Sequence, residues 1–223
     1  MVAFGAGVSP GSRVAQKHLA FVREISAQHL RLSTDLRLVA KKVEGSGCKL
    51  RDYDAAKMDA DQVRLAQLYA SAYCQTWQKF WDKALGPCDH DRPPDWCDDE
   101  AAMSQRVDLQ GYFTTLASGL DAAPSSLERE NIMDIVTSTL SAHVITEFPS
   151  DATESWATAT VVAYLKRASP EQAIELAKAL KVTWVGLAPA VLGAFDAYLN
   201  RAVSLSEDQR DGLRRALTNE VQK

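Results

Sequence analysis

The stretch that decides the fold runs from Asp59 to Leu85 and reads DADQVRLAQLYASAYCQTWQKFWDKAL. Apolar side chains recur in it every three or four residues, at Val63, Ala66, Ala70, Tyr73, Trp77, Phe80 and Ala84. This spacing is typical of a helix with one buried face. We therefore predict a helix that begins between Asp54 and Asp59 and ends at Leu85, before the helix-breaking pair Gly86-Pro87.

The same stretch carries four aromatic residues at a spacing of four, Tyr69, Tyr73, Trp77 and Trp81. Residues four apart are neighbours on a helix surface, so these rings form a ladder along one side. Aromatic side chains bury large areas when they pack against neighbouring helices. We expect the ladder to belong to the core rather than to a ligand pocket.

A similar pattern extends over residues 12–43, and it predicts a long N-terminal helix preceded by a flexible segment, residues 1–11. Its apolar stripe is His18, Val22, Ile25, His29, Leu32, Leu36, Val39 and Val43, and Gly45-Ser46-Gly47 ends it. His18 and His29 would lie about 16 Å apart along this helix, too far to share a metal ion. We expect each to be a partly buried histidine bonded to a neighbour.

The remaining chain also has helical signals. A helix is predicted from Asp99 to about Leu120, and helix starts are indicated by paired capping residues, Ser125 with Glu128, Asp151 with Glu154, Ser169 with Gln172 and Ser206 with Gln209. Signals for β-strands are weak. We predict an all-α, single-domain bundle of about seven or eight helices over residues 12–223, with a possible subdivision at 121–124.

Composition and charge exclude two classes of protein. The hydrophobic fraction of 46% and the charged fraction of 24% are those of a soluble globular chain. The net charge of −4 provides no basic surface of the kind that nucleic-acid binding requires, so no nucleic-acid partner is expected. The longest uncharged run, Val182–Phe195, is shorter than the roughly 20 residues that span a bilayer, so no membrane insertion is expected. We expect this run to form a buried helix, kinked at its glycines and proline.

The negative charge is concentrated in one short stretch, Cys88-Asp-His-Asp-Arg-Pro-Pro-Asp-Trp-Cys97, followed by Asp98-Asp99-Glu100. Residues 88–100, which we call the acidic loop, hold six carboxylates against the single cation Arg92. Their local charge of −5 leaves +1 for the rest of the chain, whose total is −4. Pro93 and Pro94 stiffen this loop.

The four cysteines, Cys48, Cys74, Cys88 and Cys97, allow three complete pairings. A Cys74–Cys88 bond is disfavoured, because the helix separates these residues by about 16 Å and only three residues remain for the chain to fold back. Two pairings remain: Cys48–Cys74 with Cys88–Cys97, which is the simpler, or Cys48–Cys88 with Cys74–Cys97. Reduced cysteines in a plain connector, a transition-metal site at Cys88, His90 and Cys97, and a calcium loop are the alternatives.

Two familiar motifs are absent: the chain has no phosphate-binding loop and no Glu-x-x-His. We expect a non-enzymatic interaction protein without a cofactor, whose acidic loop binds a protein with a basic patch. The expected contact residues are Asp89, Asp91, Asp95, Trp96, Asp98 and Asp99. A protein that binds a metal or a small hydrophobic ligand, and an enzyme with a site assembled from scattered residues, are the alternatives.

The compartment depends on the cysteines. The sequence as it stands favours a cytoplasmic protein, whereas paired cysteines behind a removed leader would favour export, because disulfides persist in oxidising compartments. The oligomeric state is left open.

Overall fold

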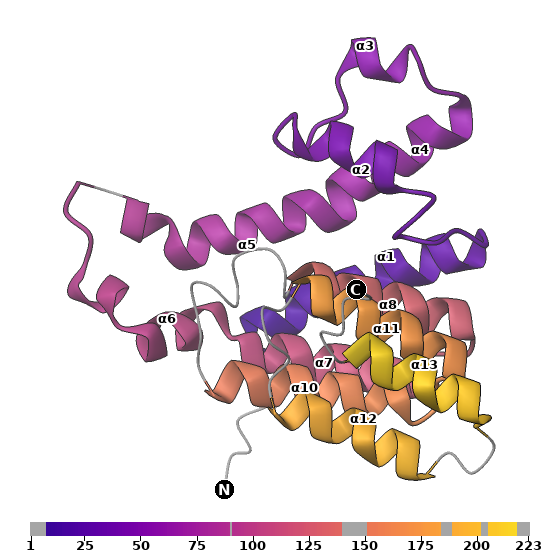
Figure 1. Cartoon of the computed structure of the whole chain (residues 1–223). Coiled ribbons are helices and arrows are strands. Elements are labelled where there is room, and N and C mark those ends of the chain that lie inside the picture. Colours follow the sequence, from indigo (N-terminus) through magenta and orange to yellow (C-terminus); the bar gives the residue numbers. More distant parts are fainter. Residues whose placement is uncertain (1–7, 90, 140–150, 184–188, 202–204, 218–223) are drawn as a thin grey trace, which may run out of the picture. The chain divides into compact units, whose positions relative to one another are not determined.

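The computed structural model describes residues 8–89, 91–139, 151–183, 189–201 and 205–217, and every regular element in these ranges is a helix (Figure 1). The chain divides into two compact units, Met1–Leu116 and Ala117–Lys223. They are called unit 1 and unit 2 below, and each is described by itself. The all-α prediction is confirmed; the expectation of one domain over residues 12–223 stays a prediction.

The long helix expected at the N-terminus is confirmed only in its first part, because the chain breaks after Ala27. Helix α1 (Pro10–Ala27) ends where His29 takes a left-handed conformation, with φ of 59°. The N–H of His29 donates to the carbonyl of Ser26, and the N–H of Leu30 donates to the carbonyl of Ile25, at 3.0 and 3.1 Å. These two bonds form a Schellman motif, which terminates a helix, usually with glycine at the left-handed position. His29 is exposed rather than partly buried, while His18 is buried in α1.

The central stretch of unit 1 folds as a nearly continuous helix with an irregular middle. Asp59 and Gln62 form a reciprocal capping box, so the helix begins one residue after the predicted window; its end at Leu85 is confirmed. A π-helical segment, η1, lies between two α-helical parts. In chain order the elements are α2 (Arg37–Glu44), α3 (Asp52–Ala55), α4 (Ala60–Leu68), η1 (Tyr69–Cys74) and α5 (Gln75–Leu85).

A second break divides the helix predicted from Asp99 to Leu120. Helices α6 (Glu100–Val107) and α7 (Leu109–Ala122) are separated by Asp108, whose φ is 52°. The Asp108 carboxylate accepts the N–H of Gly111 at 3.2 Å and the N–H of Gly11, in α1, at 2.9 Å. The break therefore joins the start of α1 to the start of α7. It also places Pro10 and Gly11, which were expected in a flexible segment, in the first turn of a helix.

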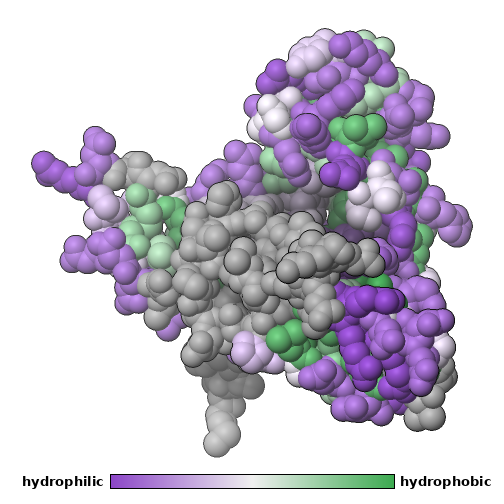
Figure 2. Space-filling model, viewed as in Figure 1, coloured by the Kyte–Doolittle hydropathy of each residue, from purple (hydrophilic) through white to green (hydrophobic). Residues whose placement is uncertain are grey.

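The buried residues of unit 1 include a cluster that joins α1, α2, α4 and η1. It contains Phe21, Ile25, Leu36, Val39, Val43, Cys48, Leu65, Ala66, Tyr69, Ala70 and Cys74. The first two rings of the aromatic ladder belong to this buried region, because Tyr69 contacts Tyr73 and Phe21 contacts both of these rings. Trp77 and Trp81 are only half-buried. The surface of the α2–α4 segment is mainly hydrophilic, with a few hydrophobic side chains exposed, as Figure 2 shows; Leu38 and Tyr53 are the most exposed of these.

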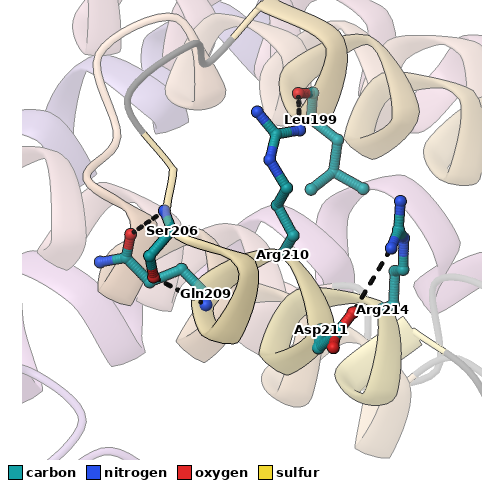
Figure 3. Close-up of polar contacts among 6 residues, drawn as sticks. All are labelled: Leu199, Ser206, Gln209, Arg210, Asp211 and Arg214. Atoms are coloured by element: carbon teal, nitrogen blue, oxygen red, sulfur yellow. Dashed lines mark hydrogen bonds and ion pairs between the residues drawn. The ribbon is translucent and has the colours of Figure 1, made fainter.

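Unit 2 is built from regular helices, two of which begin with the predicted capping boxes. Reciprocal bonds between Ser169 and Gln172 begin α11, and those between Ser206 and Gln209 begin α13 (Figure 3). The helices are α8 (Ser126–Thr139), α10 (Asp151–Leu165), α11 (Pro170–Thr183), α12 (Pro189–Arg201) and α13 (Glu207–Leu217). Helix α11 packs against α8 and α13, and α10 packs against α8 and α12.

The count of seven or eight helices is not confirmed, because the predicted helices in unit 1 are divided into shorter ones. The apolar run Val182–Phe195 was expected to form one buried, kinked helix. Residues 184–188 lie outside the described part, so this prediction is not tested. No helix in the described ranges is long and apolar enough to cross a membrane.

Candidate functional site

The acidic loop is closed by a covalent bond. Cys88 and Cys97 lie at disulfide distance, with their Cα atoms 5.7 Å apart. Two short 3-10 helices, η2 (Gly86–Asp89) and η3 (Asp95–Asp98), lie at the two ends of this ring. Pro94 precedes η3 in an extended conformation, and its carbonyl accepts the N–H of Cys97 at 2.9 Å. The ring is therefore held by a disulfide, two prolines and a backbone hydrogen bond.

The carboxylates of the loop fall into two groups. Asp91, Asp95 and Asp98 are exposed, and no side-chain hydrogen bond or ion pair is shown for them within the described residues. Asp99 is also exposed, but its Oδ1 accepts the N–H of Ala102 at 3.2 Å and so caps α6. A carboxylate at this position also stabilises the positive end of the helix dipole. Asp99 therefore has a local structural role that the other three lack.

Trp96 is half-buried, and its ring is in contact with a cation of the same unit. The guanidinium carbon of Arg106, in α6, lies 3.8 Å from the centre of the Trp96 ring. This is a close cation–π contact. The sequence suggested an exposed tryptophan at the edge of the loop, but one of its faces is already occupied by arginine.

The second cysteine pair fixes the turn after α2 to the π-helix. Cys48 and Cys74 lie at disulfide distance, with Cα atoms 5.4 Å apart. The amide of Gln75 donates to the carbonyl of Cys48 at 3.1 Å, beside the disulfide. The arrangement is the simpler of the two pairings left open by the sequence. Neither Cys88 nor Cys97 then offers a thiolate, which removes two ligands of the metal alternative.

Metal ligands do not converge elsewhere in the described ranges: these residues contain no group of three or more His, Cys, Asp or Glu side chains that could hold a metal ion. His90, the third ligand of the metal alternative, lies outside the described residues. Of the predicted contact residues, Asp89 also has its side chain outside the described part, as does Glu100 at the end of the acidic loop.

A separate polar group, His18, lies inside the aromatic part of unit 1. Its Nδ1 is 2.9 Å from the hydroxyl of Tyr112, whereas its buried Nε2 has no hydrogen-bond partner among the described residues. The rings of Tyr73, Trp77 and Tyr112 lie within 4.4 to 5.7 Å of the imidazole, measured between centroids. Burial lowers the pKa of His18 to about 3, so the ring is neutral at neutral pH.

Phenol groups next to His18 are also held in their neutral form. Burial raises the pKa of Tyr69 and of Tyr73, and the negative charge of Glu44 raises both further. The Tyr69 hydroxyl donates to the Glu44 carboxylate. With a neutral histidine and neutral phenols whose rings contact one another, this cluster is best explained as core packing.

Sequence reasoning missed one further feature, a pocket in unit 2. Its lining includes the cations Lys166, Arg167 and Arg201. These residues belong to the turn after α10 and to the end of α12, so they come from separate parts of the chain. No motif joins them, and only the packing of the helices brings them together.

Comparison with known proteins adds no assignment: the chain matches no protein-family model, no curated protein and no solved structure.

Proposed function

We propose that the chain is a non-enzymatic binding protein whose acidic loop docks onto a protein partner with a basic patch. The observation that carries this proposal is the exposure of Asp91, Asp95 and Asp98 on a ring closed by the Cys88–Cys97 disulfide. A constrained loop loses less conformational entropy on binding than a free one. Its concentrated negative charge also accelerates encounter with a basic surface.

The Trp96–Arg106 contact indicates the preferred cation. At 3.8 Å the indole already holds a guanidinium, and the exposed carboxylates lie in the same short segment. Arginine combines a planar group that stacks on aromatic rings with a fork of donors that fits carboxylates. We therefore expect the partner to present arginine rather than lysine. Paired cysteines also support export to an oxidising compartment.

The test uses the full chain and a defined probe, a glycine-spaced arginine peptide, with the lysine peptide of the same length for comparison. We expect saturable binding by calorimetry, tighter for the arginine peptide. The triple variant Asp91→Asn, Asp95→Asn, Asp98→Asn should weaken it at least tenfold. The matched control, Asp82→Asn, Asp121→Asn, Asp196→Asn, changes the net charge equally at exposed positions of α5, α7 and α12 and should weaken it far less.

Equal weakening by the two triple variants would show that only net charge matters, and the proposed site would be abandoned. Trp96→Ala gives a second readout. This change removes the aromatic ring on which a guanidinium, unlike an ammonium group, stacks. We expect the arginine peptide to lose more affinity than the lysine peptide; equal losses would contradict the role of the indole.

A further inference from the structure

A pocket of about 380 Å³ lies in unit 2, where the turn after α10 meets the start of α11 and the end of α12. Its lining residues are Leu165, Lys166, Arg167, Ala168, Pro170, Tyr198, Arg201 and Leu205. The volume falls at the lower end of the range of small-molecule sites. A ligand of this pocket must therefore be small.

The charge of the pocket is one-sided. Lys166, Arg167 and Arg201 line it, whereas no carboxylate does. None of the three cations forms an ion pair with another described residue; the Nε of Arg201 donates to the carbonyl of Ala197 at 3.2 Å, which leaves its terminal nitrogens for other partners. Three cations without a counter-charge repel one another and attract an anion.

An acid close to the pocket is Glu171, in the first turn of α11. Its carboxylate accepts from the hydroxyl of Ser169 at 2.9 Å and from the amide of Gln209 at 3.0 Å. Burial raises the pKa of Tyr198, and the charge of Glu171 raises it further, so this carboxylate acts on the pocket from nearby. Even when Glu171 is counted, three cations face one acid.

The apolar part of the lining is buried and firmly held. Leu165 and Leu205 are buried, while the three cations are exposed, so the polar groups lie toward solvent. The Tyr198 hydroxyl donates to the carbonyl of Ala168 at 3.1 Å and ties α12 to the turn after α10. An apolar group could pack against these leucines while the cations hold a charged one.

Helix α13 does not line the pocket, but its hydrogen bonds connect the helices that do. Arg210 donates to the carbonyl of Leu199 at 2.9 Å, at the end of α12, and the Ser206–Gln209 box begins α13 directly after Leu205 (Figure 3). The amide of Gln209 then reaches Glu171, so α13 is also tied to the start of α11. The pocket is therefore preformed by hydrogen bonds among three helices.

We propose that this pocket binds a small organic anion, with a carboxylate or phosphate held by Lys166, Arg167 and Arg201 and a short apolar group held by Leu165 and Leu205. Arginine and lysine are the side chains that bind such anions in proteins. This site lies in unit 2 and is independent of the acidic loop, so either proposal can fail without the other.

The experiment titrates the full chain with four probes: octanoate, octyl phosphate, octanol and inorganic phosphate. We expect saturable calorimetric binding of the two amphiphilic anions, at least tenfold tighter than octanol or inorganic phosphate, which each supply only one half of the ligand. The tighter of octanoate and octyl phosphate identifies the head group. Octanol binding as tightly as octanoate, or no saturable binding of either anion, would overturn the proposal.

Variants locate the binding within the chain. Arg167→Gln and Arg201→Gln should each weaken the better anion about tenfold while the circular dichroism spectrum stays unchanged. Arg215→Gln is the matched control, because Arg215 is an exposed arginine of α13 that does not line the pocket. It should leave the affinity within twofold of the unaltered chain. An equal effect of all three variants would assign the binding to overall charge and refute the site.

Discussion

The two units reach ordered structures by different means. Unit 1 contains all four cysteines of the chain, the π-helix and the three described non-glycine residues with positive φ, His29, Cys48 and Asp108. Unit 2 contains no cysteine, and its helices α11 and α13 begin with reciprocal capping boxes. The comparison indicates that covalent bonds and close polar contacts compensate for irregular backbone in unit 1, whereas local helix signals suffice in unit 2.

Removing the Cys48–Cys74 disulfide should have the largest effect on the difference between the two units. The bond closes a segment with a sequence separation of 26 residues, and we expect Cys48→Ser with Cys74→Ser to lower the free energy of unfolding by about 3–4 kcal/mol. The shorter ring at Cys88–Cys97 should cost about 1 kcal/mol less. Urea unfolding gives the free energies, and hydrogen exchange should show the loss of protection in α2, α4 and α5 rather than in α11 and α13.

The same chemical change should have opposite signs in the two units. A Cβ on Gly11, in α1, would lie 2.0 Å from the backbone oxygen of Asp108, so Gly11→Ala should destabilise by about 2–3 kcal/mol. A Cβ on Gly193, in α12, would meet nothing within 4 Å. Gly193→Ala should therefore stabilise by roughly 0.5–1 kcal/mol, because alanine favours a helix. Thermal unfolding shows whether each variant is stabilised or destabilised. A stabilising Gly11→Ala would refute the Asp108 contact.

Acid should weaken unit 1 through His18. Its pKa is lowered to about 3 in the folded chain, mainly by burial, from an ordinary 6.5. The unfolded chain therefore takes up a proton first, and the stability from this group, complete above pH 6.5, is lost as the pH falls toward 3. We expect a loss of about 2 kcal/mol between pH 7 and pH 5. The His18→Gln variant should lack this part of the pH dependence; an unchanged slope would contradict it.

The smallest effect is expected at a single cap of unit 2. Ser206 accepts the N–H of Gln209 at 3.2 Å, and Ser206→Ala should lower the free energy of unfolding by about 1 kcal/mol. Ser206→Gly keeps the backbone freedom suited to this position and should lower the free energy of unfolding by only a few tenths of a kcal/mol. Denaturant titration of both variants resolves the difference. Equal losses would show that the hydroxyl contributes nothing.

The difference between the two units explains which structural elements could be predicted from the sequence. Helix starts with a serine and a glutamine three residues later were predictable, because both bonds of the box are local. The cysteine pairing could be narrowed from distances along a helix. The breaks at His29 and Asp108 could not be predicted, since neither residue is the glycine that commonly marks a left-handed position. At Asp108 the compensating hydrogen bond comes from Gly11, which is distant in sequence.

In the candidate sites, too, contacts between residues distant in sequence could not be predicted. The acidic loop is one continuous segment, so its charge, prolines and cysteines were visible together. The contact of Arg106 with Trp96 was not, because it depends on how α6 turns back over η3. The pocket of unit 2 could not be predicted either, because its cations lie on two separate segments. Each of these cations alone resembles an ordinary surface charge.

The π-helix Tyr69–Cys74 explains why the aromatic ladder has a strict spacing of four. In an α-helix four residues turn through about 400°, so a ladder with this spacing drifts sideways by about 40° at each step. The wider turn of a π-helix opposes that drift, and the same histidine can then touch both Tyr73 and Trp77. If the same six residues formed a regular α-helix instead, Trp77 and the rest of α5 would be rotated relative to α4. The local geometry would then be ideal, but the wrong face of α5 would lie inward.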